Sequence, residues 1–255
     1  MRTRTLAVTA LAATALTLTA CSSSNTPAAA TTGPPAATAS TVSGTVTVLA
    51  AASLQESFTT LGKQFEAAHP GTTVKLSFGA SSALAQQINQ GAPADVFASA
   101  APTNMKQVTD VGGASAPRNF VKNVMAIAAP PSNPAKVSGL ADLARPGVKV
   151  ALCQPQVPCG AVAAQVFKNA KITVTPVTQE QDVKSTLTKV QLNEVDAGVV
   201  YATDVKAAGS KVTGIIIPAD VNASTEYPIA ALTKAPNAAG AQAFVAYILS
   251  PAGQA

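Results

Sequence analysis

Residues 45–65 read TVTVLAAASLQESFTTLGKQF, and this stretch decides the fold. The apolar run from Val46 to Leu49 is typical of a strand, and the apolar residues from Leu54 to Phe65 recur at helical spacing. Ser53 lies where the two patterns meet, and Glu56 three positions later completes a capping-box pattern. The stretch therefore predicts a strand that passes through small residues and a serine into a helix.

The same pattern occurs a second time in residues 74–88, which read VKLSFGASSALAQQI. Apolar residues alternate from Val74 to Phe78 as in a strand, and a helix is expected to follow the serines that begin at Ser81. A helix start presents unpaired backbone N–H groups and a partial positive charge, so several starts around one cleft would bind an anion without lysine or arginine. The sequence leaves open the alternative in which each serine only caps its helix.

The N-terminus predicts export. Arg2 and Arg4 precede an apolar stretch over residues 6–20, which is shorter than the roughly 20 residues of a membrane-spanning helix. We therefore expect a lipoprotein signal peptide over residues 1–20. The sequence LTAC, which ends at Cys21, resembles a bacterial lipobox, in which the cysteine becomes the lipidated first residue. Ordinary cleavage nearby, with an incidental cysteine, is the alternative.

A segment without any charged residue follows. Residues 22–43 consist mainly of Ala, Thr, Ser and Pro, and such a composition cannot form a packed core. We expect a disordered tether over residues 21–43, which would hold the protein to the membrane through a lipid on Cys21. Residues 44–255 are numerous enough for two modest lobes or one large one.

Charge and cysteine content exclude some classes of function. The formal net charge of +5 falls to +3 without Arg2 and Arg4, and no basic run is interleaved with aromatic residues, so nucleic acid is not an expected partner. Cys153 and Cys159 lie in the exported part, where they form either a disulfide across a short loop or two buried free thiols. A single histidine and the lack of Cys-x-x-Cys pairs make a zinc site improbable.

Strand and helix patterns alternate along residues 44–255, which predicts an α/β architecture with mostly parallel sheets. Further strands are expected at residues 96–100, 123–129, 147–152, 172–177, 196–201 and 229–232, and further helices at residues 103–111, 138–144, 161–170, 181–192 and 238–249. Ligands of such folds lie beyond the carboxyl ends of the strands. Ser53, Ser81, Cys159 and Tyr201 all lie at expected strand ends or helix starts.

Six short motifs carry a family resemblance. They are AASL (51–54), FGASSALAQQI (78–88), GAPADVF (91–97), VPCG (157–160), GVVYATD (198–204) and EYP (226–228). Taken in this order, they make the chain resemble the molybdate-binding protein family ModA over nearly all of residues 44–255. That family supplies the extracytoplasmic substrate-binding component of molybdate ABC importers.

The resemblance implies a type II periplasmic binding protein fold, with two α/β lobes and a ligand cleft between them. Lobe I would comprise residues 44–122 and 223–255, and lobe II residues 123–222. The ligand would be molybdate or tungstate, held as a tetrahedral oxyanion by hydroxyls and backbone N–H groups. No catalytic activity, no cofactor and no metal other than that of the oxyanion are expected.

The resemblance also assigns ligand contacts residue by residue. Ser53 and Ser81 would donate through their hydroxyls and their own N–H groups. Cys159 occupies a position where the family usually has alanine, so its backbone N–H would be the donor. The stretch QDV, which ends at Val183, gives the Val183 N–H as a further donor, and Tyr201 gives its hydroxyl.

By the same resemblance, the protein would be a lipid-anchored monomer on the outer face of the cell membrane. Its partners would be an ABC transporter permease and, through it, the ATPase. A binding protein of the same fold for another oxyanion, such as sulfate, is one alternative. A serine hydrolase is another, although the chain lacks a G-x-S-x-G elbow and its only histidine, His69, lies in an expected helix-ending turn.

Overall fold

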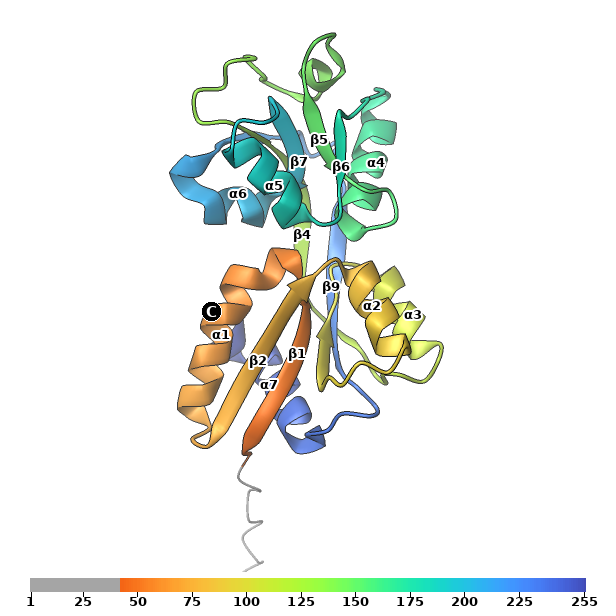
Figure 1. Ribbon diagram of the computed structural model, residues 1–255, viewed down its shortest axis with the longest axis vertical. Coiled ribbons are helices and arrows are strands. Elements are labelled where there is room, and N and C mark those ends of the chain that lie inside the picture. Colours follow the sequence, from red (N-terminus) through yellow and green to blue (C-terminus); the bar gives the residue numbers. More distant parts are fainter. Residues whose placement is uncertain (1–41) are drawn as a thin grey trace, which may run out of the picture. The chain divides into compact units, whose positions relative to one another are not determined.

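The computed structural model describes residues 42–255 (Figure 1). The expected signal peptide, Cys21 and nearly all of the expected tether lie outside the described residues. Within the described part, no helix is both long and apolar enough to cross a membrane. The described residues form two α/β lobes, each built on its own part of a mixed sheet.

The first lobe is built on three parallel strands in which small or β-branched residues are buried. Its strands are β1 (Gly44–Ala51), β2 (Thr72–Gly79) and β3 (Val96–Ala98), and β9 (Ser224–Ala231) is antiparallel to β3. Its helices are α1 (Gln55–Ala68), α2 (Ser81–Asn89), α3 (Pro102–Thr109), α7 (Ala238–Leu249) and α8 (Pro251–Gln254). The rings of Phe65 and Phe244, 5.2 Å apart, join α1 to α7 in the core.

The second lobe is centred on β7 (Ala197–Tyr201), whose five residues are all buried, as expected for a strand covered on both faces. Its other strands are β5 (Val150–Cys153), β6 (Thr178–Glu180) and β8 (Thr213–Ile216). Its helices are α4 (Pro158–Ala170), α5 (Val183–Gln191) and α6 (Ala202–Ala208), and short 3₁₀ turns lie at Leu140–Ala144 and Gly209–Lys211.

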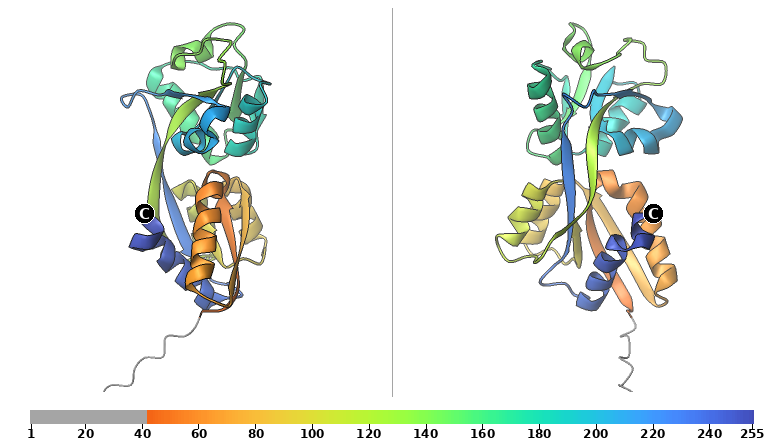
Figure 2. Two further views of the ribbon diagram at one scale, coloured as in Figure 1. Left: turned by 90° about the vertical axis from the view of Figure 1, so that its left-hand side faces the viewer. Right: turned by 180° about the vertical axis from the view of Figure 1, so that it is seen from behind.

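Two neighbouring strands connect the lobes. β4 (Arg118–Ala129) pairs with β9 through residues 118–124 and then with β7 and β8 through residues 125–129 (Figure 2). The expectation of mostly parallel sheets is therefore wrong, since β3–β9, β4–β7, β4–β8 and β4–β9 are antiparallel pairs. For β4 and β9 the reason is topological: a strand that leaves the first lobe and one that returns to it run in opposite directions when they lie side by side.

The prediction of a strand over residues 172–177 is also wrong, because these residues form no strand and β6 begins at Thr178. Ile172 and Val174 pack, only partly buried, against the core of the second lobe, while Val177 is 60% exposed. The apolar alternation there comes from a segment that covers the core without joining the sheet. The expected helix over residues 238–249 is confirmed as α7.

Candidate anion-binding site

A small cavity lies where the two lobes face each other. The first lobe contributes small residues and two serines to its lining, and the second lobe contributes the starts of its helices. The lining residues are Ala51, Ala52, Ser53, Gly79, Ala80, Ser81 and Ala100 of the first lobe and Val157, Pro158, Cys159, Asp182, Val183 and Tyr201 of the second. All five residues expected to contact the ligand are among them. The cavity has a volume of about 20 Å³, which limits it to a compact ligand. No lysine or arginine is among these lining residues.

Helix starts surround the cavity. α2 begins at Ser81, α4 at Pro158 and α5 at Val183, while α6 begins directly after Tyr201. A 3₁₀ turn over Ala52–Leu54 leads into α1. The first-turn N–H groups of a helix have no acceptor within it, and no side chain of the described residues caps the starts of α1, α2 or α4. These groups therefore give the cavity a positive potential without any cationic side chain.

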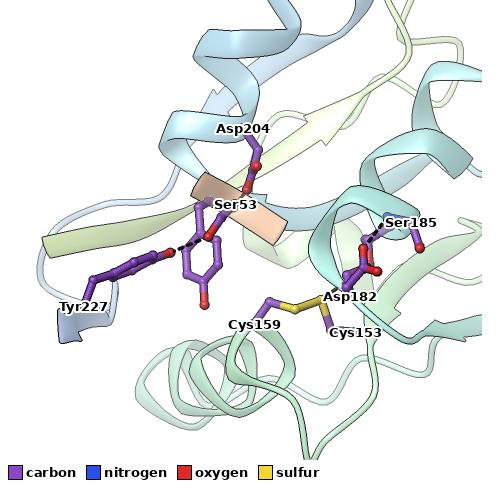
Figure 3. Close-up of a disulfide and its surroundings, with 9 residues drawn as sticks. Ser53, Cys153, Cys159, Asp182, Ser185, Asp204 and Tyr227 are labelled. Atoms are coloured by element: carbon purple, nitrogen blue, oxygen red, sulfur yellow. Dashed lines mark hydrogen bonds between the residues drawn. A yellow bond between two sulfur atoms is a disulfide. The ribbon is translucent and has the colours of Figure 1, made fainter. Parts of the chain in front are cut away.

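The expected capping box at Ser53 and Glu56 is not formed. The Ser53 Oγ lies 2.9 Å from the hydroxyl of Tyr227, which the sequence analysis left without a role (Figure 3). The burial of both groups favours this side-chain contact over a local cap. Ser81 does not cap its helix either, because its Oγ accepts a hydrogen bond from the Ala100 N–H at 2.9 Å. The hydroxyl hydrogen of Ser81 is thus left to be donated.

Tyr201 places an unsatisfied donor at the cavity. Its side chain is 1% exposed, and its hydroxyl has no hydrogen-bond partner among residues 42–255. Burial raises the pKa of this hydroxyl well above its usual value, so the group stays protonated. A buried hydroxyl without a partner costs about 1–3 kcal/mol, a cost that a bound acceptor would remove.

Cys153 and Cys159 form a disulfide, with Cα atoms 5.8 Å apart (Figure 3). The bridge joins the end of β5 to the first turn of α4. Since the Cys159 sulfur is bonded, the backbone N–H in the first turn of α4 is the hydrogen-bond donor that this residue retains. Gly160 follows it in a tightly packed turn, where a Cβ atom would collide with the carbonyl oxygen of Gln154.

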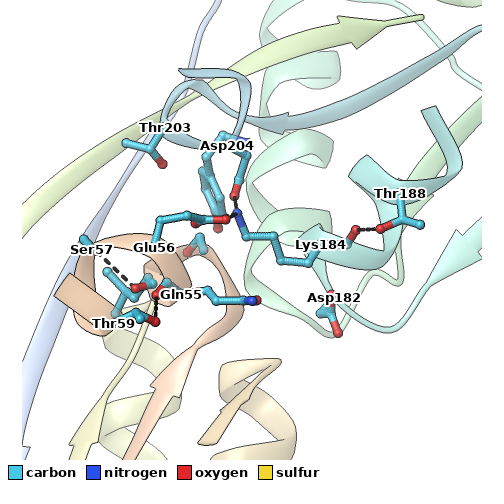
Figure 4. A network of polar contacts seen from close by, with 12 residues as sticks. Gln55, Glu56, Ser57, Thr59, Asp182, Lys184, Thr188, Thr203 and Asp204 are labelled. Atoms are coloured by element: carbon cyan, nitrogen blue, oxygen red, sulfur yellow. Dashed lines mark hydrogen bonds and ion pairs between the residues drawn. The ribbon is translucent and has the colours of Figure 1, made fainter. Parts of the chain in front are cut away.

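A network of charges lies beside the cavity and was missed by the sequence analysis (Figure 4). The Nζ of Lys184 lies 2.8 Å from an oxygen of Glu56 and 2.9 Å from Oδ1 of Asp204. Asp204 is buried, and burial raises its pKa to about 6 although Lys184 opposes the rise. Burial acts to lower the pKa of Lys184, but Asp204 and Glu56 together raise it. No local pattern pairs Glu56 with a residue 128 positions away.

Backbone contacts connect this network to the cavity. Asp204 Oδ2 accepts a hydrogen bond from the Tyr201 N–H at 3.2 Å, and Lys184 follows Val183 directly in α5. Only the motif GVVYATD, which contains both Tyr201 and Asp204, offered a signal for any of these charges. His69, by contrast, ends α1, where its ring stacks on Phe65, and it is not among the lining residues.

Comparisons with known proteins agree with this arrangement. Residues 46–255 match the family model described as bacterial extracellular solute-binding protein. The chain is 42% identical over 238 residues to the molybdate-binding protein ModA of Mycobacterium tuberculosis H37Rv, covering 93% of this chain and 89% of that protein. It is 32% identical to the putative ABC transporter substrate-binding lipoprotein YvgL of Bacillus subtilis, covering 81% of each.

A solved structure agrees as well. The substrate-binding domain of a putative molybdenum ABC transporter from Clostridium difficile is 28% identical, with a TM-score of 0.62, covering 82% of this chain and 94% of that domain. These relatives are named as binding proteins or substrate-binding components. The chain therefore belongs to the bacterial extracellular solute-binding proteins and, among them, to the ModA family, with the type II fold of periplasmic binding proteins.

Proposed function

We propose that the protein captures molybdate, and equally tungstate, outside the cytoplasm and delivers it to an ABC importer. The observation that carries the proposal is the buried hydroxyl of Tyr201, which has no partner within residues 42–255 and lies at a small cavity surrounded by helix starts. A tetrahedral dianion offers the acceptors that such donors lack. The names of the relatives in the ModA family support this ligand.

The ligand contacts follow from the groups that line the cavity. Ser53, Ser81 and Tyr201 donate their hydroxyl hydrogens, while Cys159 and Val183 donate backbone N–H groups, as do the two serines. About seven charge-assisted hydrogen bonds of about 1.5–3 kcal/mol each give on the order of 10–20 kcal/mol before costs. Micromolar affinity needs about 8 kcal/mol, so this set of donors suffices without a cationic side chain.

Selectivity would rest on size and on protonation. Sulfate is tetrahedral but smaller than molybdate, so it cannot reach all the donors at once. Phosphate keeps a proton near neutral pH, and a site made mainly of donors gives that proton no acceptor. We therefore expect molybdate and tungstate to bind alike, and sulfate and phosphate to bind poorly.

The cellular setting is part of the proposal. Lipidation of Cys21 would hold the protein at the outer face of the cell membrane, which the lipoprotein name of the Bacillus subtilis relative supports. Residues 44–122 with 223–255 would form one lobe and residues 123–222 the other. As a monomer without catalytic activity, the protein would present its liganded surface to a permease and, through it, to the ATPase.

Isothermal titration of the purified full-length chain with molybdate, tungstate, sulfate and phosphate tests the proposal. We expect similar dissociation constants for molybdate and tungstate and at least a hundredfold weaker binding of sulfate, about 3 kcal/mol. Equal affinity for sulfate would identify the protein as a general oxyanion-binding protein. Absence of binding to all four anions would overturn the proposed function.

A further inference from the structure

Ser53 and Tyr227 share one hydrogen bond, and its direction decides what Ser53 can offer to a ligand. Their oxygens are 2.9 Å apart, and each hydroxyl has a single hydrogen. If Ser53 donates to Tyr227, Ser53 presents only lone pairs to the cavity. If Tyr227 donates to Ser53, the hydroxyl hydrogen of Ser53 is left for an anion.

The side-chain amide of Asn123 settles this direction. Its Oδ1 accepts a hydrogen bond from the Val124 N–H at 3.1 Å, which distinguishes the oxygen end of the amide from the nitrogen end. The Nδ2 group lies 2.7 Å from the Oγ1 of Thr203 and 3.4 Å from the hydroxyl oxygen of Tyr227. An amide nitrogen can only donate, so both neighbouring oxygens accept.

The donor role of Asn123 then determines the donor and the acceptor in the Tyr227–Ser53 hydrogen bond. The Asn123 nitrogen cannot accept a hydrogen bond, so among residues 42–255 the Ser53 Oγ is the one hydrogen-bonded neighbour that can accept the Tyr227 hydrogen. Tyr227 is 1% exposed and burial raises its pKa, so this hydrogen stays on the phenol. Ser53 accepts it, and the hydrogen of Ser53 is directed to the cavity that Ser53 lines.

We propose that Asn123 and Tyr227 are positioning residues that orient the Ser53 hydroxyl as a donor toward a fully deprotonated tetrahedral oxyanion. The inference rests on the proposed function, in which Ser53 contacts such an anion. Neither residue is assigned a contact with the ligand. Asn123 lies on β4 and Tyr227 on β9, so the two strands that connect the lobes hold the groups that orient this donor.

A double-mutant cycle tests the proposal. The molybdate dissociation constant is measured by isothermal titration for wild type, Tyr227→Phe, Ser53→Ala and the double variant. We expect Tyr227→Phe to weaken binding about tenfold in wild type, about one hydrogen bond, and less than about twofold when Ser53 is absent. Equal losses in both backgrounds would mean that Tyr227 acts only through packing, and would overturn the inference.

Two further variants keep the test decisive. Tyr247→Phe removes a tyrosine hydroxyl bonded to Gln64 on the outer side of the first lobe, and we expect it to leave the affinity unchanged. If Tyr227→Phe does not fold, Asn123→Ala takes its place in the same cycle, with the same expected dependence on Ser53. Loss of affinity in Tyr247→Phe equal to that in Tyr227→Phe would overturn the inference. Failure of wild type to bind any tetraoxoanion would instead overturn the proposed function, and the inference with it.

Discussion

The Nζ atom of Lys184 lies 2.8 Å from each carboxylate oxygen of Glu56, and this ion pair joins α5 of the second lobe to α1 of the first. Lys184 is 18% exposed and is also paired with the buried Asp204, so its position is fixed from its own lobe. The Glu56 carboxylate is therefore the group of the first lobe that forms an ion pair with Lys184 in this arrangement of the lobes. The pair stabilises the arrangement in which all donors of the cavity meet.

Glu56→Gln should weaken molybdate binding about twofold to fivefold, the effect of losing a partly exposed ion pair. Glu194→Gln is the matched control, because its carboxylate is similarly exposed and pairs with Lys189 inside the second lobe. Both variants remove one negative charge, which by itself would favour an anionic ligand. Titrations in which Glu194→Gln loses as much affinity as Glu56→Gln would contradict a role between the lobes.

Stability should depend on pH through Asp204. Its pKa is raised to about 6 in the folded protein, against 3.8 ordinarily, so the folded state binds more protons than the unfolded state between these values. The free energy of unfolding of wild type, relative to Asp204→Asn, should therefore fall as pH rises from about 4 to about 6, and stay constant above. The fall should be on the order of 3 kcal/mol.

Urea unfolding of both proteins at several pH values between 4 and 8 measures this difference. Lys184 and Glu56 face Asp204 and are present in both proteins, so the comparison isolates the contribution of the Asp204 carboxyl group. A difference that does not change with pH would show that Asp204 is ionised throughout this range.

Tyr201→Phe should have opposite effects on binding and on stability. Without ligand, the variant loses a buried hydroxyl that no group in the described part of the chain satisfies, so we expect an unchanged or slightly higher melting temperature. Molybdate binding should weaken about tenfold or more, because a donor to the anion is lost. Differential scanning calorimetry with and without molybdate measures both effects, and a lower melting temperature of the ligand-free variant would contradict the assignment.

The backbone donor at Val183 can be removed without disturbing the helix. Val183 is the first residue of α5, where proline is well accepted, and Asp182 before it has the extended conformation that proline requires (φ −157°, ψ 174°). Val183→Pro should therefore fold and bind molybdate about tenfold more weakly, since the N–H donor is lost. Val183→Ala keeps the N–H and shortens the same side chain, so it separates packing from donation. Equal affinities of the two variants would exclude the N–H as a contact.

Features set by local sequence could be predicted, and features set by distant contacts could not. The strand, serine and helix order at Ser53 and at Ser81 depends on neighbouring residues, and both helices begin where the apolar spacing changes. The resemblance to ModA supplied Cys159, Val183 and Tyr201, which all line the cavity. The partner of the Ser53 hydroxyl could not be predicted, because Tyr227 is 174 positions away and reaches it only through the path of β9.

The antiparallel crossover strands were missed for the same reason. The apolar runs at residues 123–129 and 229–232 indicate strands, but their relative direction depends on where the chain leaves and re-enters each lobe. At Ile172 and Val174 the apolar alternation predicted a strand that the structure does not contain. A segment that covers the core can alternate in the same way without pairing with a strand.

The pairing of β4 with β9 also determines how the lobes can move. Two strands bonded edge to edge form a ribbon that flexes easily out of its plane but resists stretching and sliding, since those motions would break the ladder. The register shift between Asn119 and Val121 places a weak point within this ribbon, where it can bend more sharply. A rotation of one lobe toward the other would therefore bend this ribbon rather than shear it, and would bring the donors on the two sides together along one path.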